Sequence, residues 1–236
     1  MIPKKIHLSW KDKDLLESKS ELVQLGVKRL AELNPDLELV ISTDAEVDRY
    51  LSDNLPADDY ERIADCHIVQ KTDLWRLMKL HSEGGLYVDI DRFCNMKLDD
   101  LIDADTKWVL PTYLDYDFSH DFMMTAPNNP AFYTAVSLYL QRLKEGHRDV
   151  YFLGPQTYMH AVALTLTGEM VQTNPGVSKF NGIRSIINHF GFIKTFREDP
   201  PHETILYRDG DTVLNLEHLK RAFYADSGLR HWTNQW

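Results

Sequence analysis

Four polar residues that lie close together in the sequence could bind a charged substrate. Asp73 and Arg76 belong to the apolar stretch DLWRLMKLHS, and Asp89 and Asp91 follow a short apolar run after Gly84-Gly85. Paired carboxylates are hard oxygen ligands of the kind that Mg²⁺ and Mn²⁺ prefer, often jointly with substrate phosphates. Arginine offers a planar fork of donors to carboxylates and phosphates. These residue types therefore suit a site that holds a metal ion and a phosphate.

Asp73 falls on the apolar face of a helix that the sequence predicts over residues 64–82. At about 100° per residue, the helical wheel places Asp73 between Leu77 and Leu80, with Arg76 at the edge of the same stripe. A carboxylate in this position is costly unless it is paired or bound. Two interpretations remain open. Either Asp73 and Arg76 form an internal salt bridge, or both point from a buried helix into a ligand cleft.

Asp89 and Asp91 are placed by a strand that the sequence predicts over residues 86–91. Strand alternation then puts both carboxylates on one face and Ile90 on the other. The pair comes at the carboxyl end of the strand, where open α/β sheets bind their ligands. An isolated Asp-x-Asp is usually a pair of solvated loop acids, but the preceding apolar strand and Gly-Gly turn favour a binding site.

The elements that must position these residues alternate between strand and helix. In the first half, strands are predicted over 5–10, 37–41 and 86–91. Helices are predicted over 15–33 and 64–82, and a further helix is predicted to begin at the capping residues 42–44. In the second half, strands are predicted over 108–112 and 122–126, and helices over 131–143 and 155–166. Helix and strand in turn indicate an α/β domain with a mainly parallel sheet, followed by a less regular C-terminal part. We expect a single domain over residues 1–236.

Composition narrows the classes of function. The chain has 236 residues, with 36 acidic and 26 basic side chains and a formal net charge of −10. This balance disfavours a nucleic-acid or anionic-membrane surface as the main function. Cys66 and Cys94 lack zinc-site spacing, so we interpret both as packing residues. We expect a cytoplasmic protein, because no signal peptide or membrane span is evident in the sequence. Neither a P-loop nor a dinucleotide fingerprint occurs.

The stretch from Asp73 to Asp91 closely resembles the DXD signature of glycosyltransferases with the sugar-nucleotide-binding GT-A fold. The particular resemblance is to glycosyltransferase family 32, which includes capsular-polysaccharide sugar transferases and the initiating mannosyltransferase of yeast outer chains, with the clostridial glucosylating toxins as relatives. The opening IPKKIHLSW is similar to the family's IPKxIHxxW strand. The closing HWTNQW is similar to its HW-x-x-S-W, with Gln235 where serine is usual. Gly154-Pro155 resembles a turn that is common in the family.

The resemblance implies a GT-A-type, Rossmann-like sheet flanked by helices, in which residues 1–98 bind the nucleotide sugar and 99–236 form the acceptor side and tail. It implies that Asp73 and Arg76 contact the sugar and phosphate region of the donor. Within the Asp-Ile-Asp motif, it implies donor contacts across all three residues: Asp89 would hold ribose and sugar hydroxyls and share the metal, and Asp91, after Ile90, would be the main metal ligand.

The resemblance also assigns roles to aromatic residues at the two ends of the chain. Trp10 would stack on the nucleotide base, whereas the alternative is an ordinary core tryptophan. His231 would supply a further metal ligand, and Trp232 would donate from its indole N–H to the leaving oxygen. For the tail with His231, Trp232 and Trp236, the alternative is a frayed terminus.

The implied activity is metal-dependent transfer of a sugar from a UDP- or GDP-sugar to an acceptor hydroxyl, with Mn²⁺ or Mg²⁺ as cofactor. The resemblance further implies retention of anomeric configuration and a place in glycan or polysaccharide synthesis. Two other classes remain open. One is a glycoside hydrolase with Asp89 and Asp91 as its acid–base pair, and the other is a non-catalytic module that binds nucleotide sugars or glycans.

A polar cluster precedes the strand predicted over 122–126. It contains Asp115, Asp117, His120 and Asp121, and we expect a solvated loop here. The family usually places a sugar-contacting asparagine nearby, so His120 or Asp121 as its substitute is the alternative. We interpret the remaining histidines of interest as structural: His67, His81 and His160.

Overall fold

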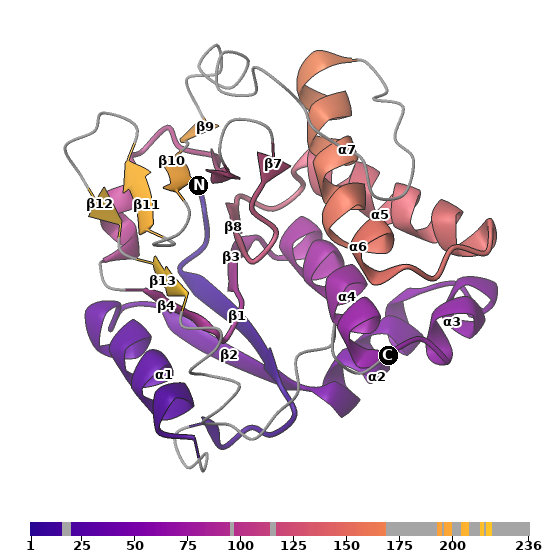
Figure 1. The fold of residues 1–236 in the computed structure, drawn as a ribbon, viewed down its shortest axis with the longest axis horizontal. Coiled ribbons are helices and arrows are strands. Elements are labelled where there is room, and N and C mark those ends of the chain that lie inside the picture. Colours follow the sequence, from indigo (N-terminus) through magenta and orange to yellow (C-terminus); the bar gives the residue numbers. More distant parts are fainter. Residues whose placement is uncertain are drawn as a thin grey trace.

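The computed structural model describes residues 1–15, 20–94, 97–113 and 117–168, and the short strands within 193–218. Its centre is a mixed sheet with the strand order β2-β1-β3-β8-β5-β9 (Figure 1). The bounds are β1 Lys5–Trp10, β2 Glu38–Thr43, β3 Gly85–Val88, β5 Trp108–Val109, β8 Phe122–Thr125 and β9 Ile193–Lys194. Among these described strands, β1–β2, β1–β3 and β5–β9 pair in parallel, and β8 runs antiparallel to both of its neighbours. The predicted α/β class is confirmed.

Two smaller sheets accompany the central one. The first has the order β12-β11-β10-β6-β7, and the second pairs β13 with β4. Their bounds are β4 Arg92–Cys94, β6 Thr112–Tyr113, β7 Asp117–Phe118, β10 Phe196–Asp199, β11 Thr204–Tyr207, β12 Val213–Leu214 and β13 Leu216–His218. The single strand predicted over 108–112 is therefore wrong, since β5 and β6 belong to different sheets.

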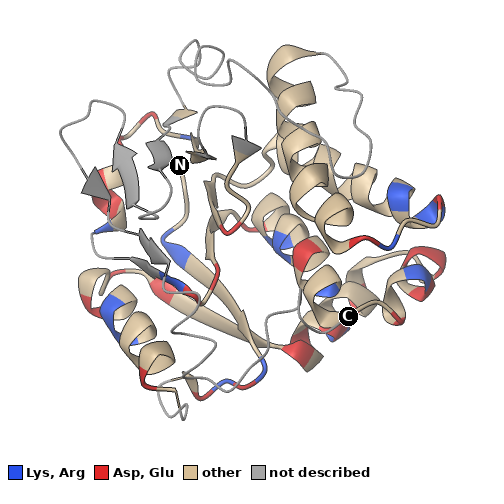
Figure 2. Cartoon of the chain, in the orientation of Figure 1, with Lys and Arg blue, Asp and Glu red and all other residues tan. Residues whose placement is uncertain are grey.

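Helices cover both faces of the central sheet. They are α1 Glu21–Leu33, α2 Asp44–Asn54, α3 Ala57–Ala64, α4 Ile68–Ser82, α5 Pro130–Lys144, α6 Val150–Leu153 and α7 Pro155–Thr167, with a 3₁₀ turn at Leu98–Leu101. None of these helices combines the length and the apolar character needed to cross a membrane. Figure 2 shows basic (blue) and acidic (red) residues interspersed along the helices.

Two apolar clusters hold these layers together. One lies under α1, where Val23 and Val27 pack with Leu86 and Val88 of β3. The other lies on the opposite face of the sheet, where α4, α5 and α7 pack. Tyr87, which lies between Leu86 and Val88 in β3, belongs to this second cluster. Because successive strand residues point to opposite faces, β3 contributes to both clusters and is buried on both sides.

The helix predicted over 64–82 is wrong at its start, because the structure breaks it between α3 and α4. His67 caps α4 there: its Nδ1 accepts from the N–H of Val69 at 3.2 Å, and the Gln70 side chain accepts from the N–H of His67 at 3.0 Å. These two bonds satisfy donors that a helix start leaves unpaired. The structural interpretation of His67 is consistent with this cap.

The strand predicted over 86–91 is also shorter than expected, because β3 ends at Val88. Asp89 then donates its backbone N–H to the carbonyl of Asp121 at 2.8 Å, and Arg92 N–H returns to the Asp89 carbonyl at 3.0 Å. The Asp-Ile-Asp motif is consequently a turn that leaves the sheet, and strand alternation does not set the directions of its two carboxylates.

Candidate functional site

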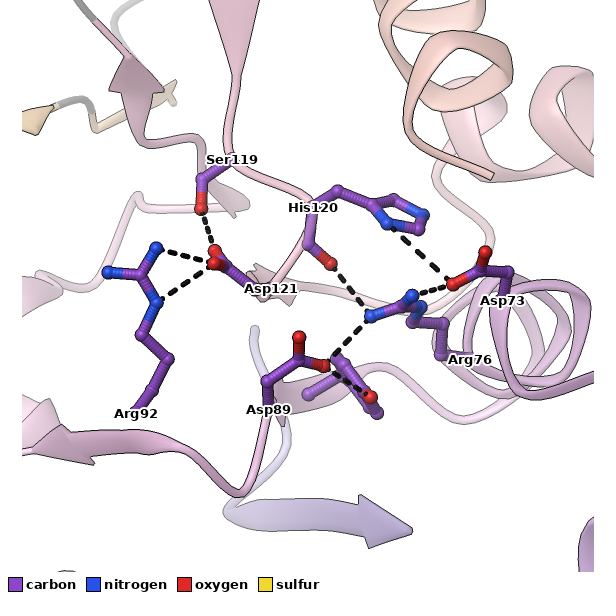
Figure 3. A network of polar contacts seen from close by, with 8 residues as sticks. Asp73, Arg76, Asp89, Arg92, Ser119, His120 and Asp121 are labelled. Atoms are coloured by element: carbon purple, nitrogen blue, oxygen red, sulfur yellow. Dashed lines mark hydrogen bonds and ion pairs between the residues drawn. The ribbon is translucent and has the colours of Figure 1, made fainter. Parts of the chain in front are cut away.

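Helix α4 carries Asp73 and Arg76 into the interior of the protein. The Asp73 residue is 1% exposed and Arg76 is 6% exposed. The guanidinium of Arg76 forms an ion pair with Asp73, so the predicted internal salt bridge is present. Arg76 also donates to Asp89 Oδ1 at 3.0 Å and to the His120 carbonyl at 3.1 Å (Figure 3). The pair therefore also connects to the Asp-Ile-Asp turn, and the second interpretation, a ligand cleft, stays a prediction.

Asp89 receives two donors on one carboxylate oxygen. Its Oδ1 accepts from Arg76 and, at 2.7 Å, from the hydroxyl of Tyr87. The Arg76 guanidinium also lies 4.8 Å from the centroid of the Tyr87 ring. Tyr87 stands two positions before Asp89 in the sequence, and this closeness was the signal that could have linked them. The sequence reasoning did not single out Tyr87.

Burial and neighbouring acids set the protonation of Asp89. Burial is the largest cause and raises the pKa of Asp89 to about 6; Arg76 lowers it, whereas Asp91 and Asp121 raise it further. The side chain still exposes 36% of its surface, so the carboxylate lies at the junction between the interior and solvent. Three acids in one place repel one another, and a bound cation would relieve that repulsion.

The charges near the turn fit a divalent cation held together with a phosphate. Four carboxylates, those of Asp73, Asp89, Asp91 and Asp121, stand against two guanidiniums, those of Arg76 and Arg92. No three His, Cys, Asp or Glu side chains in the described part of the chain are grouped so that they could hold a metal ion by themselves. Mg²⁺ commonly takes only one or two carboxylates and completes its shell with water and substrate phosphates. Asp89 and Asp91 could supply such a pair.

The segment before β8 is not the solvated loop that we expected. Ser119, His120 and Asp121 lie against the site because Asp121 is held from two sides: Arg92 Nε donates to Asp121 Oδ2 at 2.8 Å, and the hydroxyl of Ser119 donates to Asp121 Oδ1. Figure 3 shows this group beside the Asp73–Arg76–Asp89 chain. Asp115 lies outside the described residues, as does the side chain of Asp117.

His120 is a buried neutral imidazole. Burial is the largest cause that holds the pKa of His120 well below its ordinary value, and Arg76 adds to the effect. Its Nδ1 is 3.9 Å from Asp73 Oδ1, which for a neutral ring is a polar contact and not an ion pair. The ring also packs against Tyr158 of α7, with centroids 5.7 Å apart. His120 thus contacts both α4 and α7.

Other predicted site residues lie at the same end of the sheet or outside the described part. Trp10 ends β1 and is half-buried against the cluster under α1. β1 and β3 pair in parallel, with Ile6 opposite Leu86 and His7 opposite Tyr87, so the end of β1 at Trp10 and the turn after β3 lie at the same end of the sheet. Ile90 packs against the same cluster. His231 and Trp232 lie outside the described residues.

The remaining side chains of interest have structural contacts. Cys66 is half-buried and packs against the core, while the side chain of Cys94 lies outside the described part. His81 Nδ1 lies 3.4 Å from the Asn129 carbonyl, and His160 contacts Arg142. These contacts agree with the structural interpretation of both histidines.

We expect Asp73→Asn to destabilise the protein by about 1–3 kcal/mol in urea unfolding. The change weakens a charge-assisted hydrogen bond in the interior, but Arg76 keeps Asp89 and the His120 carbonyl as partners. The matched control is Asp48→Asn, because Asp48 pairs with Lys71 and its side chain is 38% exposed. The control should lose less than about 1 kcal/mol. Equal losses in the two variants would show that Arg76 does not hold Asp73 as described.

Part of the chain matches a known protein family, and the fold is similar to a solved structure. Residues 20–108 match a family described as "Glycosyltransferase sugar-binding region containing DXD motif". The matched range contains α4 and the Asp-Ile-Asp turn. The fold is similar to that of the solved structure named PaToxG Glycosyltransferase, with a TM-score of 0.51 over 71% of this chain and 70% of that one. The sequence identity is 20%, so this similarity concerns the fold alone.

Two fission-yeast proteins and one budding-yeast protein are similar in sequence. Inositol phosphoceramide mannosyltransferases 1 and 2 of Schizosaccharomyces pombe are 26% and 31% identical, over 80% and 67% of this chain and 60% and 43% of their own lengths. Mannosyl phosphorylinositol ceramide synthase SUR1 of Saccharomyces cerevisiae is 29% identical over 66% of this chain and 37% of its own. The chain thus spans between about a third and three fifths of these curated relatives.

Proposed function

We propose that this chain is a metal-dependent glycosyltransferase that moves a sugar from a nucleotide-sugar donor to an acceptor hydroxyl. The observation that carries the proposal is the ion-paired chain Asp73–Arg76–Asp89, which runs from the interior to the turn that holds Asp91. The matching DXD family and the three yeast relatives support the same class of reaction.

The charge balance supports a metal requirement. With four carboxylates against two guanidiniums, the described side chains around the turn would repel the diphosphate of a donor. A divalent cation bound by Asp89 and Asp91 would reverse that repulsion and stabilise negative charge on the departing diphosphate. Arg76 would keep the Asp89 carboxylate oriented toward this centre, because it binds one of the two Asp89 oxygens at 3.0 Å.

The other residues have proposed roles around the same centre. Trp10 would stack on the nucleotide base, and Asp73 and Arg76 would contact the sugar and phosphate end of the donor. His231 and Trp232 would supply a further ligand and a hydrogen-bond donor from the tail. Reaction with retention of configuration at the anomeric carbon is part of the proposal and rests on the resemblance to family 32.

The names of the yeast relatives guide the choice of donor and acceptor. Those proteins are named for mannosyl transfer to inositol phosphoceramide, so we propose mannose as the first sugar to test. We propose a hydroxyl of a glycolipid headgroup or of a glycan as the acceptor.

A glycoside hydrolase is the second candidate function. The observation that favours it is the presence of two carboxyls, those of Asp89 and Asp91, in the one turn after β3, because glycoside hydrolases commonly use a pair of carboxyls. A hydrolase of this kind would release sugar from an aryl glycoside in EDTA. A hydrolase mechanism would not explain the buried Asp73–Arg76 pair.

The proposal is tested by a thermal-shift panel of GDP-mannose, other GDP-sugars and UDP-sugars, each with Mn²⁺ and with EDTA. A ligand at a hundredfold excess over its Kd stabilises the folded state by about 2.7 kcal/mol, so binding should be evident. We expect one nucleotide class to raise Tm only with Mn²⁺, and Asp91→Asn to abolish that shift. A shift that persists in EDTA, or no shift with any member, would contradict a metal-dependent donor site.

A further inference from the structure

The main chain at Gly154 lies against the Asp73 carboxylate. Gly154 separates α6 from α7, and a Cβ atom added to Gly154 would lie 2.1 Å from Asp73 Oδ2 and 2.7 Å from Asp73 Cγ. A Cβ atom therefore has no room at Gly154, and the position requires glycine for space. The Asp73 carboxylate is thus enclosed by Arg76 on its own helix and by the main chain of Gly154.

Arg142 of α5 ties together the two sides of the Gly154 turn. Its Nη1 donates to the Phe152 carbonyl and to the Thr157 hydroxyl, both at 2.6 Å. The Thr157 hydroxyl in turn donates to the Phe152 carbonyl at 3.1 Å. The second amino group of Arg142 contacts His160 Nδ1, one turn further along α7. One guanidinium therefore binds the residue two positions before Gly154 and the residue three positions after it.

The Arg142 guanidinium is a charged group buried beside the Gly154 turn. Arg142 is 8% exposed, and among the described residues its hydrogen bonds go to uncharged groups, while Glu145 acts on its charge without such a bond. Its partners are a carbonyl, a hydroxyl and an imidazole, together with the Phe152 ring, whose centroid lies 3.9 Å from the guanidinium carbon. Burial lowers the pKa of Arg142 to about 10 and the pKa of His160 to about 3, so His160 accepts as a neutral ring. A buried cation whose hydrogen bonds all go to neutral groups contributes little net stability, which favours a role in geometry.

We infer that Arg142 is a positioning residue for the proposed donor site, because it holds Gly154 against the Asp73 carboxylate and thereby fixes Asp73 on Arg76. The inference rests on the proposed function for its kinetic consequence, but not for its structural one. Helix α5, which carries Arg142, packs against both α4, which carries Asp73, and α7, which follows Gly154. Arg142 itself touches neither Asp73 nor the Asp-Ile-Asp turn.

The test uses three variants of the full chain. Arg142→Met removes the fork and keeps an unbranched apolar side chain, and Arg142→Lys keeps the charge with a single donor group. Gly154→Ala displaces Asp73 directly and serves if Arg142→Met does not fold. The matched control is Arg148→Met, because Arg148 is exposed and donates to the carbonyls of Leu143 and His147 without contacting the turn at Gly154.

The first readout is a crystal structure of each variant, which requires no activity. We expect Arg142→Met and Gly154→Ala to move the Asp73 carboxylate away from its contact with Arg76, whereas Arg148→Met leaves that contact unchanged. An intact Asp73–Arg76 contact in both site variants would overturn the positioning role, whatever the chain catalyses.

The second readout is the kinetics of donor turnover, measured for folded protein only. We expect Arg142→Met to lower kcat by about 10²-fold with a smaller change in KM for the acceptor, since a displacement of about 1 Å can have this effect, and Arg142→Lys to recover part of it. The Arg142→Met/Gly154→Ala double variant should lose little more than either single variant, because both act through Asp73. If the losses of the two single variants were additive in the double variant, Arg142 and Gly154 would not both act through Asp73, and the inference would be overturned. Absence of turnover in the wild type would instead contradict the proposed function, and the crystal structures would still decide the positioning role.

Discussion

Asp91→Asn is expected to lower the rate of sugar transfer by about 10²-fold or more and to abolish Mn²⁺-dependent binding of the donor. Asp91 is 6% exposed and belongs to the turn that follows β3. The described side chains offer few ligands, so the loss of one anionic oxygen ligand weakens the whole centre. The amide has nearly the same volume as the carboxylate, and the variant should keep the circular dichroism spectrum of the wild type.

The matched control for this prediction is Asp99→Asn. Asp99 is also an aspartate and lies eight positions after Asp91 in the sequence. Its side chain is 52% exposed and pairs with Lys4. The control should turn over donor within about twofold of the wild type, as surface pairs contribute little. Turnover of Asp91→Asn at the level of the control would remove Asp91 from the proposed metal site.

Arg76→Met is expected to have the largest effect on stability, about 3–5 kcal/mol in urea unfolding, together with loss of transfer. Arg76 binds both Asp73 and Asp89 through its guanidinium. Its removal leaves the buried Asp73 carboxylate without a cation, and breaking a buried pair in this way is strongly destabilising. Arg76→Lys should lose less stability but should not restore transfer, because a single ammonium cannot reproduce a fork that binds two carboxylates and a carbonyl.

Arg62→Met is the control for Arg76→Met. Arg62 lies on α3, pairs with Asp59 at 3.6 Å, and exposes 34% of its side chain. Less than about 1 kcal/mol should be lost there. A loss for Arg76→Met no greater than for Arg62→Met would mean that the network of ion pairs contributes neither stability nor geometry.

The burial of Asp73 was predictable because helical periodicity depends only on spacing along one element. The wheel placed Asp73 among the apolar residues of α4, and the structure confirms that Asp73 and Arg76 are buried together. The capping residues at 42–44 were equally local: Thr43 caps α2, with a reciprocal bond to Glu46. Features of this kind follow from a few neighbouring residues, so the sequence was sufficient for them.

The ends of two elements were wrong because partners distant in the sequence decide them. The alternation of Leu-Tyr-Val-Asp-Ile-Asp continues to Asp91, but the backbone leaves the sheet after Val88 when Asp89 N–H bonds the Asp121 carbonyl. The helix over 64–82 was split by a cap at His67, and histidine is not among the usual capping residues. The periodicity of apolar residues in the sequence predicts neither the end of β3 nor the start of α4.

The burial of His120 and the pairing of Asp121 were missed for a related reason. In the sequence they belong to a charge-rich run, which is typical of a solvated loop. In the structure, Arg92 and Ser119 pair with Asp121, and the ring of His120 packs against Tyr158 of α7. Arg92 is 29 positions from Asp121 in the sequence, so only the fold could bring them together. The contact of Gly154 with Asp73 arises in the same way.

The measurement that tests glycosyl transfer most directly follows release of the nucleoside diphosphate from a panel of GDP- and UDP-sugars, starting with GDP-mannose. It compares the wild type with Asp91→Asn, each in Mn²⁺ and in EDTA, with and without glycan and glycolipid acceptors. The expected result is release from one nucleotide class, by the wild type only, in Mn²⁺ only, and faster when an acceptor takes up the sugar. Release that Asp91→Asn or EDTA leaves unchanged, or no release from any donor of the panel, would contradict a metal-dependent transferase centred on the Asp-Ile-Asp turn.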